Sequence, residues 1–332
     1  RYNKSHHNNA CGIHMNGDIS LGGGDGKINN ARVEGNLIYE NGVGGGSGIN
    51  CDGVTNSIFL NNLLYENHAS GMSLYMIDGG GPSVNNKVYN NTIINATNAR
   101  WCLNIVDGST GNTVYNNILI NKHSFRGSIT IDAASLTGFT SNNNIVIGRM
   151  SNDGDNTTIT LAAWRTATGD DINSLLAAGQ TSIFVNPTAA DFHLLAGSQA
   201  INAGISAVSA SVTNDRDLNL RPQGSGYDIG CYEYLQATSI SEAGENEYSV
   251  SVSPNPFSAE AVFTFSKEVK NATLKIYSLL GQEEKSIFFS GKQVILNKDI
   301  LPSGVYFYQL STSCPQGEGR GEVIATGKII IQ

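Results

Sequence analysis

The chain has 332 residues, of which 40% are hydrophobic and only 14% are charged, and its formal net charge is −8 at pH 7. With 38 Gly and 7 Pro residues, this composition excludes collagen, a coiled coil and a charge-rich disordered chain. The acidic balance argues against a nucleic-acid partner, because phosphate contacts need clustered Lys and Arg. The sequence contains no apolar run of about 18 residues, which is the length that would predict a membrane-spanning helix.

Residues 1–150 carry two interleaved repeats. The first is a residue pair containing Asn followed by a short apolar strand, and the second residue of the pair is Asn36, Asn62, Asn91, Asn117 and Asn144. The second is a short apolar strand that ends in aspartate, at Asp52, Asp78, Asp107 and Asp132. Both repeats advance by about 26 residues, which indicates one structural unit used many times. Because no helical pattern fills the gaps, the repeat predicts a coil of short parallel strands.

The asparagines of this segment fit such a coil. Asn tolerates the left-handed backbone region that tight corners between strands require. Stacked Asn side chains can also hydrogen-bond to their copies in the coils above and below, so we expect a structural Asn ladder. The chain begins at Arg1 in repeat-like sequence without a leader peptide, and we expect that N-terminal coils are missing.

The recurring string Asn-Asn-(Leu/Ile/Thr)-(Leu/Ile)-(Tyr/Ile) resembles the right-handed parallel β-helix superfamily. That group includes pectate-lyase-like and other secreted polysaccharide-acting proteins. The resemblance covers roughly residues 10–150 and implies the fold, whereas one fold hosts many activities. We therefore expect an all-β chain whose residues 1–150 form the coils of a right-handed parallel β-helix.

Residues 151–235 depart from the repeat. A short helix is expected between residues 160 and 178, with Asp170 and Asp171 inside it. The stretch from Asp191 to Glu233 is similar to the closing segment of many bacterial secreted β-helix proteins. Because an open solenoid end exposes apolar core, we expect residues 151–235 to form the last coils and the C-terminal cap.

Within that closing segment, three charged residues are expected to form ion pairs. Asp217, Arg221 and Asp228 are interpreted as a structural ion network rather than as catalytic groups. The five cysteines are scattered without a CxxC pair, so zinc and thioredoxin-like sites lack support and we expect small buried side chains.

The polar and acidic residues 236–248 are typical of a linker, and alternating strands follow in residues 249–332. About seven short strands in this length predict a small Ig-like β-sandwich. The segment resembles the C-terminal sorting domain of type IX secretion cargo through motifs that contain Pro254, Asn255, Pro256, Gly281, Gly304, Tyr306 and Lys328. The resemblance implies an address read by an outer-membrane translocon, and hence a secreted or outer-membrane protein of a Gram-negative bacterium.

The candidate chemistry is that of polysaccharide lyases. The Gly-His-Gly and Arg-Ile-Lys strings of polygalacturonase-type hydrolases and the Gly-x-Ser-x-Gly motif of serine hydrolases are absent. Lyase action on uronic acids needs a cation and a base. A column of Asp52, Asp78, Asp107 and Asp132 offers ligands for Ca²⁺. The candidates for the base or a carboxylate clamp are Arg100, Lys122 and Arg126.

Aromatic and histidine side chains supply further candidates. A sugar-stacking platform is predicted from Tyr75, Trp101 and Phe125, with core packing as the alternative. His6, His7 and His14 form the densest histidine cluster and a second possible metal site.

Two hypotheses remain open at this point. One is an exported monomeric β-helix protein that binds an extracellular polysaccharide and cleaves it, with a lyase favoured over a glycoside hydrolase. The other is a non-catalytic adhesin or structural surface solenoid. The sorting resemblance agrees with both.

Overall fold

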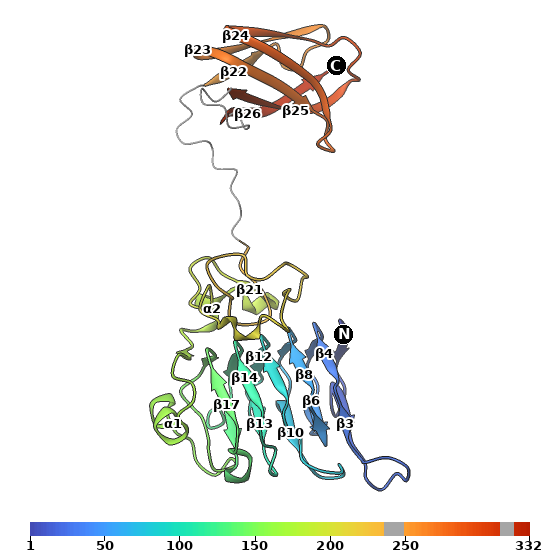
Figure 1. The fold of residues 1–332 in the computed structure, drawn as a ribbon, viewed down its shortest axis with the longest axis vertical. Coiled ribbons are helices and arrows are strands. Elements are labelled where there is room, and N and C mark those ends of the chain that lie inside the picture. The colour runs from blue at the N-terminus through green and yellow to red at the C-terminus, as the bar shows by residue number, and fades with distance from the viewer. Residues whose placement is uncertain (236–248, 313–321) are drawn as a thin grey trace. The chain divides into compact units, whose positions relative to one another are not determined.

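The computed structural model describes residues 1–235, 249–312 and 322–332 (Figure 1). The chain divides into two compact units, Arg1–Gln236 and Ala237–Gln332. The predicted linker, residues 236–248, lies outside the described residues, as does Cys314.

Parallel strands of the first unit stack into three sheets along the coil axis. The seven-stranded sheet has the order β1 (Lys4–His6), β5 (Leu37–Tyr39), β9 (Leu63–Tyr65), β12 (Thr92–Asn95), β15 (Ile118–Asn121), β18 (Ile145–Val146) and β19 (Leu175–Leu176). A five-stranded sheet has the order β16 (Ile129–Ile131), β13 (Leu103–Ile105), β10 (Ser70–Tyr75), β6 (Ser47–Asp52) and β2 (Ile13–Asn16). The other has the order β17 (Thr140–Asn142), β14 (Thr113–Tyr115), β11 (Lys87–Tyr89), β8 (Ile58–Leu60) and β4 (Arg32–Glu34). Short strands β3 (Ile28–Asn29) and β7 (Val54–Thr55) form a parallel pair.

Each sequence repeat builds one coil, and equivalent strands of successive coils pair in parallel. Leu63 of β9 lies beside Thr92 of β12, which lies beside Ile118 of β15. The predicted parallel β-helix is therefore confirmed. Its interior is a continuous apolar core between the three sheets, with side chains such as Phe59 and Leu64 fully buried.

The Asn ladder is present as predicted. The side-chain amide of Asn36 donates to the carbonyl oxygen of Asn62 at 2.8 Å, and the same contact continues from Asn62 to Asn91 at 2.9 Å. It extends from Asn91 to Asn117 at 3.0 Å and from Asn117 to Asn144 at 3.1 Å. All five side chains are buried or nearly so, and the ladder therefore supplies hydrogen bonds where water has no access.

The cysteines of the first unit are mostly buried. Cys51, Cys102 and Cys231 are fully buried, as predicted for small core side chains, while Cys11 is partly exposed. Burial raises the pKa of the Cys231 thiol to about 11, so it stays protonated and unreactive at neutral pH.

The C-terminal end of the coil is covered by helix α1 (Leu161–Thr168), within the range in which a helix was predicted. Thr160 caps its N-terminus by accepting from the backbone N–H of Ala163, and buried Leu161 and Trp164 pack onto the core. The prediction that Asp170 and Asp171 lie in this helix is wrong, because the left-handed Gly169 ends it.

Residues 180–235, here named the side segment, lie along the flank of the coils (Figure 1). The segment contains α2 (Gln180–Ile183) and the antiparallel pair β20 (Phe184–Asn186) and β21 (Asp191–Leu194). Side-chain amides at the coil corners donate to its backbone carbonyl groups from Asn61, Asn90, Asn116 and Asn143. Residues 151–235 were expected to form the last coils and the C-terminal cap, and within this range the side segment contacts several successive coils from one side.

The expected ion network of the side segment is also different. Arg221 pairs with Glu233 at 2.6 Å, and both side chains are buried. Asp217 instead pairs with His193 at 2.9 Å, and the carboxylate of Asp228 accepts backbone N–H groups. The sequence pattern missed Glu233 because its proximity to Arg221 depends on the turn between them.

The second unit is one curved antiparallel sheet (Figure 1). Its described strands are β22 (Val250–Ser253), β23 (Glu260–Tyr277), β24 (Glu283–Asn297), β25 (Gly304–Thr312) and β26 (Glu322–Ile331). There are five described strands where about seven shorter ones were expected, because β23 and β24 continue through irregularities around Val269. The predicted fold class, all-β with a parallel β-helix followed by a C-terminal β module, is confirmed, and where an Ig-like β-sandwich was expected the described strands of that module form one antiparallel sheet.

The residues that carry the sorting resemblance lie at turns and in strands β25 and β26 of this unit. The side-chain carbonyl of Asn255, between Pro254 and Pro256, accepts from the backbone N–H of Ile330 at 2.8 Å. The hydroxyl of Tyr306 donates to the carbonyl of Pro302 at 2.9 Å. The remaining residues are Gly281 in the β23–β24 turn, Gly304 at the start of β25 and Lys328 in β26.

Candidate functional site

Five of the residues singled out in the sequence line one cleft of about 590 Å³ in the first unit. Arg100 and Trp101 come shortly before β13, and Arg126 comes shortly before β16. Asp107 and Asp132 follow the same two strands. Each strand has only three residues and spans ~10 Å, so side chains at both of its ends reach the same cleft. We call this site the acidic cleft.

Side chains that the sequence reasoning missed complete the acidic cleft. Asn104 points outward from the middle of β13, since its neighbours Leu103 and Ile105 are buried. Asp153 and Asp155 come from the loop that follows the last repeat. No periodic signal could have found these two aspartates, because the repeat ends before them and only the folding of the loop brings them to the coils.

Asp155 organises one wall of the acidic cleft. The guanidinium of Arg126 donates to its carboxylate at 2.8 Å from Nη2 and at 3.1 Å from Nε. The indole N–H of Trp101 donates to the other carboxylate oxygen at 2.6 Å. Arg126 is therefore held by a bidentate ion pair, and a guanidinium so engaged is not free to act as a base.

Arg100 is different, because its side chain is exposed at the cleft and its guanidinium forms no hydrogen bond or ion pair with any residue that the structure describes. It is thus available to a ligand. Lys122, the third candidate, does not line the cleft and instead pairs with Glu66. Of the three basic candidates, Arg100 therefore lines the cleft without a partner among the described residues, Arg126 lines it within an ion pair, and Lys122 lies outside it.

The charge of the acidic cleft is dominated by carboxylates. Four aspartates face two arginines among its lining residues. Hydrogen bonds from the hydroxyl and backbone N–H of Thr157 lower the pKa of Asp153, with smaller contributions from its other neighbours, so that carboxylate is ionised at neutral pH. Carboxylates and the amide of Asn104 can bind hydroxyl groups, whereas a polyanion meets net repulsion.

The column of four aspartates does not form a single site. Asp52 is buried and accepts from the backbone N–H groups of residues 77, 78 and 79 at 2.7 to 3.1 Å, so it holds a turn. Asp132 similarly accepts from Ser135 and Asp107 at 2.8 Å each. Only Asp107 and Asp132 line the cleft, whereas Asp78 lies in an exposed turn outside it.

Within residues 1–235, 249–312 and 322–332, no three His, Cys, Asp or Glu side chains are grouped to hold a metal ion. His6 stacks on Tyr39 with ring centroids 4.8 Å apart, and His7 pairs with Glu40. Among these residues, the structure therefore shows no cluster of metal ligands at the predicted Ca²⁺ site or at the predicted histidine site.

The three aromatic candidates do not share a surface. Trp101 is only 1% exposed, as the alternative of core packing implies, and its indole N–H donates a hydrogen bond to Asp155. Tyr75 is partly buried and its hydroxyl accepts from the amide of Asn50. Phe125 is 41% exposed, but neither it nor Tyr75 lines the acidic cleft.

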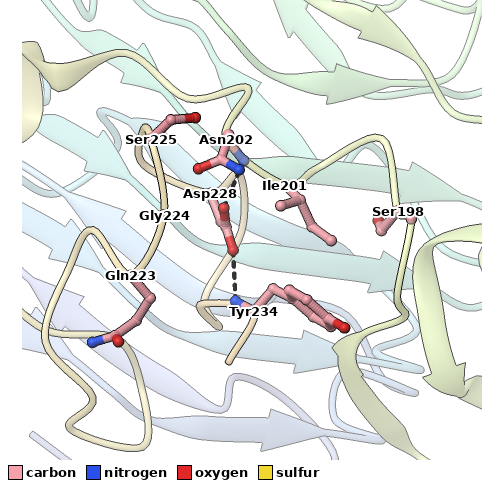
Figure 2. A pocket seen from close by; sticks show the side chains of 9 residues that line it. Ser198, Ile201, Asn202, Gln223, Gly224, Ser225, Asp228 and Tyr234 are labelled. Atoms are coloured by element: carbon pink, nitrogen blue, oxygen red, sulfur yellow. Dashed lines mark hydrogen bonds between the residues drawn. The ribbon is translucent and has the colours of Figure 1, made fainter. Parts of the chain in front are cut away.

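A second hollow, of about 530 Å³, lies within the side segment (Figure 2). Its lining comes from residues 197–202, from residues 223–228 and from Tyr234. Asp228 lies at its centre and accepts from the backbone N–H groups of Asn202 at 2.7 Å and Tyr234 at 2.5 Å. Burial raises the pKa of Asp228, since these hydrogen bonds offset the loss of water only in part. We call this hollow the side pocket.

Comparison with known proteins adds no assignment: no protein-family model matches the chain, and no curated protein matches it. Among the described residues, no helix combines the length and apolar character needed to cross a membrane.

Proposed function

We propose that this chain binds an extracellular polysaccharide in the acidic cleft, and that its second unit directs export through a type IX translocon. The observation that carries the binding proposal is the convergence of Arg100, Asn104 and four carboxylates in one cleft on the solenoid. Such a set of charged and amide groups can hydrogen-bond to several hydroxyl groups at once.

The chemistry of the acidic cleft favours binding of a neutral chain over cleavage of a polyuronate. Lyase action needs a free base and neutralisation of the substrate carboxylate. Arg126 is engaged by Asp155, and the excess of aspartates repels a polyanion. Arg100 is the remaining candidate base, because its guanidinium has no partner among the described residues. We therefore rank a non-cleaving binder first and a lyase second.

Affinity electrophoresis of the full chain in gels containing neutral or uronic-acid polysaccharides tests this ranking. We expect retardation by a neutral polysaccharide that is lost when Asp153 and Asp155 are both changed to Asn. The matched control is Asp25→Asn, in an exposed loop away from the cleft. Retardation by no polysaccharide would contradict the binding proposal, and release of unsaturated product from a polyuronate that depends on Arg100 would favour the lyase.

The export proposal rests on the ordered motifs of the second unit and on their placement at its turns and in strands β25 and β26. It is tested by expressing the tagged full chain in a bacterium with a type IX system and measuring the cell-surface and medium fractions. We expect export of the parent chain and retention of the Lys328→Ala variant in the periplasm. The exposed Lys292 on β24 gives the matched control, Lys292→Ala. Equal export of a chain that ends before residue 249 would contradict the proposal.

A further inference from the structure

We propose that the side pocket binds a single neutral sugar ring, at a site separate from the acidic cleft. The pocket volume of about 530 Å³ lies within the ~300–1,000 Å³ typical of small-molecule sites. None of its lining residues contributes to the acidic cleft. The inference therefore does not depend on what the cleft binds.

The floor of the side pocket supplies a buried acceptor. Asp228 is 2% exposed, and its carboxylate uses two acceptor positions for the backbone N–H groups of Asn202 and Tyr234. An ionised carboxylate has about four such positions, so two remain for hydroxyl donors of a ligand. A ligand hydroxyl that donates to Asp228 uses one of these remaining positions.

The rim of the side pocket supplies uncommitted polar groups. Gln223 donates its amide to the carbonyl of Leu220 at 2.7 Å, and its own carbonyl oxygen accepts from no described residue. Asn202 accepts from the backbone of Gly226 at 2.8 Å, and its amide nitrogen has no described acceptor. The hydroxyl of Ser225 is likewise without a partner in the described chain. Sugar hydroxyls both donate and accept, and so match this mixture of groups.

The opposite side of the side pocket is formed by Ile201, Ser198 and the aromatic ring of Tyr234. Figure 2 shows Tyr234 and Ile201 on one side and Gln223 and Ser225 on the other. Both apolar side chains pack against a hydrophobic cluster of the first unit, which fixes their position. A sugar ring has an apolar C–H face and a polar edge of hydroxyl groups, and this division of the pocket fits both.

The charge of the side pocket disfavours acidic sugars. The lining contains one carboxylate and neither Lys nor Arg, so a uronic acid has no cation to pair with. The nearby guanidinium of Arg221 donates to Glu233, to the carbonyl of Gly230 at 2.7 Å and to that of Asp228 at 3.1 Å. It is therefore committed to holding the side segment together.

Saturation-transfer NMR of the full chain with the methyl glycosides of glucose, galactose and mannose tests the proposal. We expect transfer to at least one of them, and loss of that transfer in Ser225→Trp, which fills the pocket. Gln223→Ala removes one polar contact and is expected to weaken binding about fivefold, the equivalent of about 1 kcal/mol. The matched control is Ser209→Trp, at an exposed serine of the same segment outside the pocket.

The cleft variant with Asp153 and Asp155 changed to Asn keeps the two sites apart. It is expected to bind the glycoside as the parent does, even if it loses the polysaccharide. The proposal is overturned by transfer to none of the three glycosides, by transfer that survives Ser225→Trp, or by transfer that the cleft variant abolishes. Circular dichroism of each variant checks that the fold is intact.

Discussion

The two residues of each Asn-Asn pair have different tasks. The first adopts a left-handed backbone, with φ of 53° at Asn61, 50° at Asn90 and 58° at Asn116. It turns the corner between two sheets, a conformation that Asn accepts more readily than most residues. The second, such as Asn117, points inward and builds the ladder. Two identical neighbours in the sequence are thus distinguished only by the direction of the backbone.

This division of tasks predicts the effect of Asn117→Ala. The substitution removes the acceptor for the backbone and side-chain N–H groups of Asn91, at 2.9 and 3.0 Å. Because a buried donor without a partner costs about 1–3 kcal/mol, we expect the free energy of unfolding to fall by about 2–4 kcal/mol. Denaturant unfolding measures it. Asn98→Ala, at an exposed position, is the control and should cost less than about 0.5 kcal/mol.

At the scale of elements, a histidine that lies between two carboxylates links two parts of the side segment. The ring of His193 in β21 contacts Asp191 at 2.6 Å through Nδ1 and Asp217 at 2.9 Å through Nε2. It also packs on Tyr232 with centroids 4.1 Å apart. This arrangement joins β21 to the turn around residue 217, so its strength should follow the charge of the ring.

The stability from this contact depends on pH in a defined direction. Burial lowers the pKa of His193, but hydrogen bonds to Asp217 and Asp191 outweigh burial and raise it above its ordinary value of 6.5. A raised folded pKa means that the stabilisation is complete below about pH 6.5 and is lost as the pH rises through the folded value. The pKa of Asp191 is lowered, chiefly by its hydrogen bond to His193. Protonation of Asp191 in strong acid therefore also weakens this contact.

Thermal melts of the parent chain and His193→Gln should therefore differ most near pH 6 and least near pH 8.5. His14→Gln, at an exposed histidine of β2, is the control and should show no such dependence. A difference between parent and His193→Gln that stays constant over this range would contradict the assignment of charge to the contact.

At the scale of the whole molecule, each unit has a hydrophobic core of its own. The coil core runs between the three parallel sheets, and the second unit packs residues such as Phe263, Leu274 and Ile329 against one another. Phe263 is fully buried and meets Tyr308 edge to face at 5.0 Å. Because each unit has a core cluster of its own, we expect the two units to unfold as separate cooperative transitions.

Calorimetry of the full chain tests this expectation with one core substitution. Phe263→Ala should destabilise the second unit by about 3–5 kcal/mol and lower only the transition that belongs to it. Phe59→Ala, in the coil core, should lower only the other transition. A single transition that both substitutions shift together would show that the units are coupled.

The sequence by itself determined the coil and its ladder, because a regular period places identical residues above one another and local backbone preference decides the corners. It also predicted that Arg100, Lys122 and Arg126 lie near the column of aspartates, and of these three only Arg100 and Arg126 line the cleft with Asp107 and Asp132. Only the tertiary structure decided that Asp155 joins Arg126 and Trp101 and that the side segment covers the flank. Those contacts link residues outside the period to residues within it, and their sequence separation leaves no local signal to show which side chains will meet.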